Sequence, residues 1–190
     1  ALFLLLNGWH HAVVDPVMAV ITYKFTGVPL YLLALYYITR KHGINALWVM
    51  VPGMILLVTL TDQVHVHFFK EYFMRYRPCK NLLLMDQVHL VVGCGGKYGF
   101  VSGHATTNFG IAFLLSAWLR NRAWTLGLFG WAALVAYSRI YVGVHYPGDI
   151  AGGVLLGFAL SGLVLLATRW GWQRWLQPSA HHPSPNKPNE

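Results

Sequence analysis

The amino-acid sequence predicts an all-α, polytopic membrane protein, a transmembrane helical bundle with five to six spans. Hydrophobic residues make up 56% of the 190 residues and charged residues only 11%, which is too little charge to cover a soluble domain of this size. The apolar residues form runs long enough to cross a bilayer. The basic residues stand singly or in pairs at the ends of these runs, where they set membrane topology.

We expect three parts along the chain. Residues 1–25 are predicted to be an interfacial or oblique N-terminal segment, because the first apolar run is too short to span and Asp15-Pro16 is typical of a helix start. Residues 26–176 are predicted to form the membrane domain, and the Pro-rich, polar residues 177–190 a disordered tail. The clear spans are expected at residues 28–38, 45–69, 103–119, 123–142 and 150–168.

The basic residues predict the orientation of these spans. Counting spans places three basic groups on one face, which the positive-inside rule makes cytoplasmic: Arg40 and Lys41, Arg120 and Arg122, and Arg169 and Arg174. The loop of residues 70–101 and the stretch of residues 139–149 then share the opposite, extracytoplasmic face. That loop is itself basic, against the rule, so its positive charge indicates a purpose other than topology.

The net charge of +8 does not indicate a nucleic-acid-binding protein. The cations are not gathered on one segment with interleaved aromatic residues, as a nucleic-acid surface requires. The two cysteines, Cys79 and Cys94, lie in one polar loop. This pattern favours a disulfide in an oxidising compartment, with two unpaired thiols as the alternative, because sequence alone does not establish pairing.

Three polar clusters share the outer face. They are Lys70-x6-Arg77-Pro78, then Ser102-Gly103-His104, then Ser138-Arg139-x5-His145-x3-Asp149. Arg offers a planar fork that fits phosphate oxygens, and Lys adds a point charge. Ser102 and Gly103 open a helix whose first N–H groups have no intrahelical partner, and Gly lets an anion approach the backbone closely. These clusters therefore predict a site for phosphate or a similar oxyanion.

The histidines add chemistry to this predicted site. Asp149 can accept a hydrogen bond from one ring nitrogen of His145 and leave the other nitrogen free to attack phosphorus. His104 can then give a proton to the leaving oxygen. Neither step requires a metal, because cations and N–H groups supply the electrostatic stabilisation.

The three clusters, in this order and spacing, resemble the three-part signature of the type-2 phosphatidic acid phosphatase superfamily over roughly residues 25–170. The resemblance implies a helical core, a phosphohistidine intermediate on His145, His104 as the acid for the leaving group, and Asp149 orienting His145. It also implies phosphate ligands at Lys70, Arg77, Ser102, Gly103 and Arg139. One position departs from the usual pattern: Val101 stands where the family has Pro, and we expect the anion site to survive with a looser loop.

We therefore expect a compact bacterial lipid phosphatase of the inner membrane, multi-pass, with its site facing the periplasm or outside. It would need no cofactor or metal, and its partners would be the bilayer and a lipid phosphate rather than nucleic acid. Four substrates stay open: undecaprenyl diphosphate, phosphatidylglycerol phosphate, phosphatidic acid and a lipid A phosphate. The alternatives are a phosphotransferase using the same site, a non-catalytic transporter or binder of anionic lipid, and a haloperoxidase-like oxidase. The oligomeric state is undetermined.

Three further polar residues lie within the second expected span. His65 and His67 point about 200° apart on a helix, which favours separate interfacial histidines over a shared metal site. Asp62 is expected to pair with a cation or to shape the site.

Overall fold

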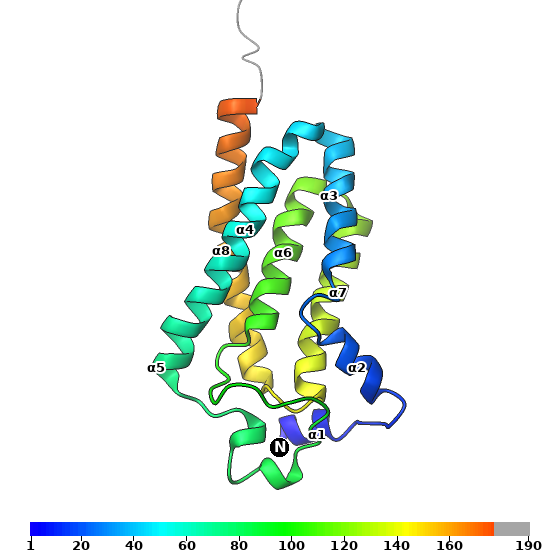
Figure 1. Ribbon diagram of the computed structural model, residues 1–190, viewed down its shortest axis with the longest axis vertical. Helices are drawn as coiled ribbons and strands as arrows, with labels where there is room; N and C mark the ends of the chain where they lie inside the picture. Colours follow the sequence, from blue (N-terminus) through cyan, green and yellow to red (C-terminus); the bar gives the residue numbers. More distant parts are fainter. Residues whose placement is uncertain (177–190) are drawn as a thin grey trace, which may run out of the picture.

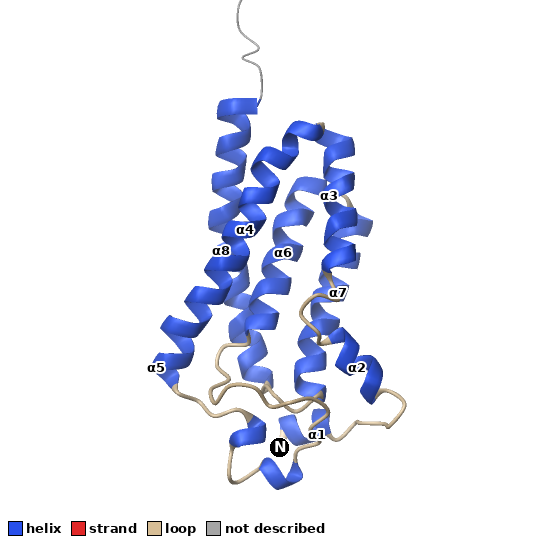
Figure 2. Cartoon of the chain, in the orientation of Figure 1, coloured by secondary structure: helices blue, strands red, loops and turns tan. Residues whose placement is uncertain are grey.

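The computed structural model describes residues 1–176, and the regular elements of that part of the chain are helical (Figure 2). This confirms the all-α prediction. Five long helices run side by side as an elongated bundle (Figure 1). They are α3 (Val28–His42), α4 (Leu47–Val64), α6 (Gly103–Leu119), α7 (Arg122–Tyr141) and α8 (Pro147–Gly171). The expected disordered tail, residues 177–190, lies outside the described residues.

Helix α6 is the centre of the bundle. It packs against α8, α7, α4 and α3. Its residues Ile111, Leu114 and Leu115 belong to the main core, where Leu114 and Leu115 are fully buried. Because α6 is apolar on most of its circumference and is surrounded by other helices, it fits the pattern of a helix buried at the middle of a bundle.

Polar side chains link α6 to its neighbours within the apolar core. Thr61 of α4 and Thr107 of α6 share a hydrogen bond of 2.9 Å between their hydroxyls. Trp118 of α6 donates from Nε1 to the hydroxyl of Thr168 on α8 at 3.4 Å. Such bonds join helices in surroundings where no water competes for them. They hold together the helices that carry the polar clusters.

The short elements gather mostly at the end of the bundle where α6 and α8 begin (Figure 1). Helix α4 continues through η2 (His65–Lys70) into α5 (Glu71–Phe73), and a loop then carries η3 (Pro78–Lys80) and η4 (Met85–Gln87). The N-terminal α1 (Leu2–Asn7) and α2 (Asp15–Ile21) pack against α7 at this same end. The remaining short elements, η1 (Ile44–Ala46) and η5 (Trp172–Leu176), lie at the opposite end.

Two helical stretches in the described residues are long and apolar enough to cross a membrane, Ile44–Phe73 and Pro147–Leu176. Helix α6, with 17 residues, is about 26 Å long, slightly less than the hydrocarbon thickness of a bilayer, and α3 has 15 residues. The count of five to six spans and the domain boundaries at residues 25 and 176 therefore stay predictions.

Two leucines of α7 test the packing. Leu128 is fully buried and Leu126 is 65% exposed, so they differ in burial on one helix. Leu128→Ala should lower the free energy of unfolding by about 2–5 kcal/mol, since it leaves a cavity among the helices. Leu126→Ala should cost less than about 1 kcal/mol. Thermal unfolding in detergent measures both, and equal losses would contradict the packing described here.

Candidate active site

The turn before α8 is built around Asp149. Pro147 stands in the first turn, where its missing N–H costs no hydrogen bond. Asp149 is fully buried, and its Oδ2 accepts a hydrogen bond from the backbone N–H of Tyr146 at 2.8 Å. Its Oδ1 accepts from Nη1 of Arg75 at 3.2 Å. The carboxylate thus caps the helix N-terminus and is neutralised by a cation, which offsets the cost of its burial.

His145 precedes this turn and is 2% exposed. Its Nδ1 lies 3.4 Å from Oδ2 of Asp149, and its backbone N–H donates to the carbonyl of Arg139 at 3.2 Å. Burial lowers the pKa of His145 to about 4. Asp149 acts in the opposite direction, because it stabilises the charged ring, but its effect is smaller. The ring is therefore neutral at neutral pH, with its Nε2 directed away from Asp149.

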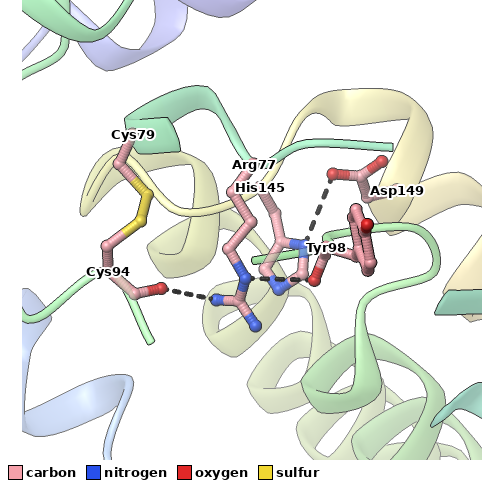
Figure 3. The surroundings of a disulfide bond; sticks show 6 residues. All are labelled: Arg77, Cys79, Cys94, Tyr98, His145 and Asp149. Atoms are coloured by element: carbon pink, nitrogen blue, oxygen red, sulfur yellow. Dashed lines mark hydrogen bonds and ion pairs between the residues drawn. A yellow bond between two sulfur atoms is a disulfide. The ribbon is translucent and has the colours of Figure 1, made fainter. Parts of the chain in front are cut away.

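Arg77 is held by backbone carbonyls of a loop. Its Nε donates to the carbonyl of Tyr98 at 3.2 Å and its Nη1 to the carbonyl of Cys94 at 3.0 Å. Cys94 forms a disulfide with Cys79, so the cross-link ties together the two segments that position this guanidinium (Figure 3). Arg77 is 8% exposed, and burial lowers its pKa. Because these bonds use two of the five N–H groups, one N–H of Nη1 and both of Nη2 stay available to an anion.

The start of α6 adds the second cluster. Ser102 is fully buried and its hydroxyl accepts from the backbone N–H of Ala105 at 3.5 Å, so it serves as the N-cap. Its own N–H donates to the carbonyl of Asp149 at 3.0 Å, which joins α6 to α8. Gly103 lies against the ring of His65, since a Cβ there would stand 2.5 Å from His65 Nε2. A side chain at this position would therefore require the buried ring of His65 to move.

A cavity of about 580 Å³ opens where the three clusters meet. Six of the residues predicted for the site line it: Lys70, Arg77, Gly103, His104, Arg139 and His145. Asp149 lies behind His145, and Ser102 belongs to the helix cap rather than to the cavity wall. The wall also contains Lys24, Phe25, Val58, Thr59, Asp62, Gln63, His65, Thr107 and Asn108.

Sequence reasoning missed several residues that build this site. Arg75, one of the cations of the basic loop, pairs with Asp149 and also stacks on Tyr146 at 4.5 Å from the ring centre. Gly99 packs closely on the same groups: a Cβ there would make a tight contact of 3.1 Å with Asp149 Oδ2 and lie 3.6 Å from His145 Nδ1. No motif or periodicity distinguished either residue, because their roles depend on contacts with a segment about fifty to seventy residues away.

His65 and His67 point apart, as expected, but His65 is not the interfacial histidine that we predicted. His65 is buried and lines the cavity, whereas His67 is exposed and faces Glu71 at 3.4 Å. Within residues 1–176, no group of three or more His, Cys, Asp or Glu side chains is arranged to hold a metal ion.

The protonation of His145 can be measured directly. In protein labelled with ¹³C-histidine in detergent, the His145 ring should titrate with a midpoint near 4, well below the ordinary value of 6.5, because burial disfavours the imidazolium. Loss of the signal in His145→Gln assigns it. Asp149→Asn should move the midpoint lower still, because Asp149 supports the charged form. A midpoint at or above 6.5 would contradict the buried, neutral ring.

Comparisons with known proteins agree with the resemblance of the three clusters. The model of the PAP2 superfamily matches residues 46–173. The chain is 37% identical to the lipid A 4′-phosphatase of Porphyromonas gingivalis over 185 residues, which are 96% of this chain and 78% of that protein. It is 29% identical to the undecaprenyl-diphosphatase BcrC of Bacillus subtilis over 80% of this chain and 73% of that protein.

Solved structures agree as well. The crystal structure of Aquifex aeolicus LpxE superposes with a TM-score of 0.63 at 28% identity, over 87% of this chain and 93% of that one. A transmembrane PAP2-type phosphatidylglycerolphosphate phosphatase from Bacillus subtilis superposes with a TM-score of 0.64 at 22% identity, over 91% and 87% of the two chains, which shows a shared fold. Together with the match over residues 46–173, these likenesses show that the chain belongs to the PAP2 superfamily.

Proposed function

We propose that this protein is a bacterial membrane phosphatase that removes a phosphate from a lipid A-type saccharolipid. The observation that carries the proposal is the cavity that gathers Lys70, Arg77, His104, Arg139 and His145. The lipid A 4′-phosphatases of Porphyromonas gingivalis and Bacteroides thetaiotaomicron, 37% and 34% identical to this chain, support the choice of substrate.

The rest of the cavity wall favours a sugar over a hydrocarbon next to the phosphate. Asp62 and Gln63 stand exposed on α4 beside the cavity, and Asn108 lies across it on α6. Carboxylate and amide groups hydrogen-bond to sugar hydroxyl and amide groups. The exposed Asp62 and Gln63 can bond to a sugar but not to a prenyl chain. Asn108, in contrast, already bonds to the hydroxyl of Tyr31 and the carbonyl of His104. The wall therefore supports a saccharolipid more than a polyprenyl diphosphate.

The first chemical step would use the neutral ring of His145. Its Nε2 attacks the phosphorus atom while Asp149, facing Nδ1, orients the ring and stabilises the positive charge that develops. The bond from phosphorus to the sugar oxygen breaks, and that oxygen takes a proton from His104. A phosphohistidine and the dephosphorylated lipid are formed.

The second step would restore the enzyme. His104, now neutral, takes a proton from a water molecule whose oxygen attacks phosphorus, the bond to Nε2 breaks, and inorganic phosphate leaves. Lys70, Arg77 and Arg139 would stabilise the charge of the phosphoryl oxygens in both steps. These cations supply positive charge at the position where a metal ion would otherwise do so, which supports a metal-independent reaction.

We further propose that the protein lies in the inner membrane with the cavity on the outer side. Arg40, Lys41, Arg120 and Arg122 lie at the end of the bundle opposite to the cavity, as the positive-inside rule requires of a cytoplasmic face. The disulfide between Cys79 and Cys94 supports the same orientation, because disulfides persist in oxidising compartments.

Phosphate release in detergent tests the reaction. Purified protein should release phosphate from lipid A with EDTA present, and His145→Ala should reduce the rate at least about a thousandfold because it removes the nucleophile. Phosphatidic acid, phosphatidylglycerol phosphate and undecaprenyl diphosphate complete the panel. Activity that vanishes with EDTA would sink the metal-independent mechanism. A folded wild type that releases nothing, but passes phosphate to an added lipid acceptor, would indicate a phosphotransferase.

The preference among substrates tests the polar wall in the same assay. Gln63→Leu keeps the size of the side chain but removes its amide. The substitution should lower kcat/KM for lipid A about tenfold, because the sugar would lose its bond to the amide. The kcat/KM for undecaprenyl diphosphate should not change. A greater rate on undecaprenyl diphosphate in the wild type would reverse the substrate assignment.

The orientation is tested by labelling in intact cells. Leu83 is 85% exposed in the loop at the end of the bundle where α6 and α8 begin, and Arg122 begins α7 at the opposite end. A membrane-impermeant maleimide should label Leu83→Cys and leave Arg122→Cys unlabelled until the cells are lysed. The reverse pattern would place the cavity in the cytoplasm.

A further inference from the structure

The N-terminal segment, residues 1–25, precedes the residues that match the family model, yet it is anchored against the catalytic end of α7. Asn7 is 1% exposed, and its side-chain amide donates to the carbonyls of Tyr141 at 2.7 Å and Ile140 at 3.2 Å. Its side-chain oxygen accepts from the backbone N–H of His89 at 2.8 Å. A buried amide with this many partners defines one position for the start of the segment.

A second anchor lies in α2. The hydroxyl of Tyr141 donates to Oδ1 of Asp15 at 2.7 Å, and Nε2 of His89 lies 3.0 Å from Oδ2. The bond from Tyr141 lowers the pKa of Asp15, as expected for a carboxylate that accepts hydrogen bonds in its charged form. Asp15 is the first residue of α2, so these bonds fix the start of the short helix whose C-cap, Thr22, contacts Arg139.

Thr22 follows the last residue of α2 and is 6% exposed. Its hydroxyl accepts a hydrogen bond from Nη1 of Arg139. This is the one bond of the Arg139 side chain within residues 1–176, and the buried Nε of Arg139 has no partner there. The hydroxyl of Thr22 therefore orients the guanidinium of Arg139, which is otherwise held only by packing in the described part of the chain.

The same segment contributes to the cavity in two other ways. The backbone carbonyl of Thr22 faces the ring of His104. Lys24 and Phe25, which follow directly, form part of the cavity wall. Residues 22–25 thus lie along one side of the site, although no motif of the sequence marks them.

We propose that Thr22 is a positioning residue of the active site, whose hydroxyl directs the guanidinium of Arg139 toward the phosphate. The inference rests on the proposed function in that Arg139 is taken to bind the substrate phosphate. Thr22 is a neutral partner and leaves the charge of Arg139 uncompensated, which a carboxylate at this place would not do. A phosphate then gains the full attraction of an oriented cation.

Substitutions at Thr22 test this role. Thr22→Val keeps the shape and removes the hydroxyl, so the affinity for orthovanadate, a phosphate analogue, should fall about tenfold, the effect of one hydrogen bond to a charged group. The KM for the lipid should rise by a similar factor while kcat changes less, because His104 and His145 keep their places. Thr22→Ser retains the hydroxyl and should restore both values to within about threefold of wild type.

Thr26→Val is the matched control. Thr26 directly follows the segment, its hydroxyl donates to the carbonyl of Val20 in α2 at 2.6 Å, and it is not part of the cavity wall. It should leave KM and the affinity for orthovanadate unchanged. If Thr26→Val or Thr22→Ser lost as much affinity for orthovanadate as Thr22→Val, the segment would matter only for packing, and the proposal would be overturned. An unchanged affinity of Thr22→Val for orthovanadate would overturn the proposal as well.

Two further measurements keep the outcome clear. If thermal unfolding in detergent shows that Thr22→Val does not fold, Thr22→Ser is compared with Thr22→Ala, and equal orthovanadate affinities of these two overturn the proposal. Orthovanadate binding, followed by thermal shift, needs no turnover. A wild type that binds orthovanadate but releases no phosphate from any lipid would therefore sink the proposed function alone, and Thr22 would still be judged by binding.

Discussion

The buried carboxylate of Asp149 is the constraint on which the end of the bundle that holds the cavity depends. A charge without exposure to water is unfavourable unless hydrogen bonds and a cation compensate it. Here the side chain accepts from the backbone of Tyr146, pairs with Arg75 and faces His145, while its carbonyl accepts from Ser102. One residue therefore joins the start of α8, the start of α6 and the loop before it.

The cations of the cavity are held differently from Arg75. In the described part of the chain, Arg77 is bonded by the carbonyls of Cys94 and Tyr98, and Arg139 by the hydroxyl of Thr22. Neither guanidinium forms an ion pair among residues 1–176. Neutral partners orient a cation without cancelling its charge, and the field in the cavity stays positive. Such an arrangement attracts an oxyanion. The stability of the fold alone would not require two buried cations without an ionic partner.

Much of the fold follows from the sequence. The predicted span at residues 103–119 coincides with α6, because Ser102 is a good N-cap and the apolar run ends at Arg120. The N-terminal segment was less well predicted. Asp15 begins α2, as its neighbour Pro16 indicates, but its side chain bonds to Tyr141 instead of capping the helix. A local pattern identifies the helix start, whereas the partner of the side chain comes from a distant part of the chain.

The sequence by itself determined the helical class, the order of the long helices and the set of charged and histidine residues proposed for the site, because hydropathy, helix caps and motif spacing are local properties. Only the tertiary structure decided that Ser102 is a cap behind the cavity, that Arg75 pairs with Asp149, that Gly99 packs closely on Asp149 and that Thr22 contacts Arg139. These contacts join residues as far as 117 positions apart. They exist because the packing of α1 and α2 on α7, and of α6 on α8, brings those residues together, and no periodicity in the chain records that packing.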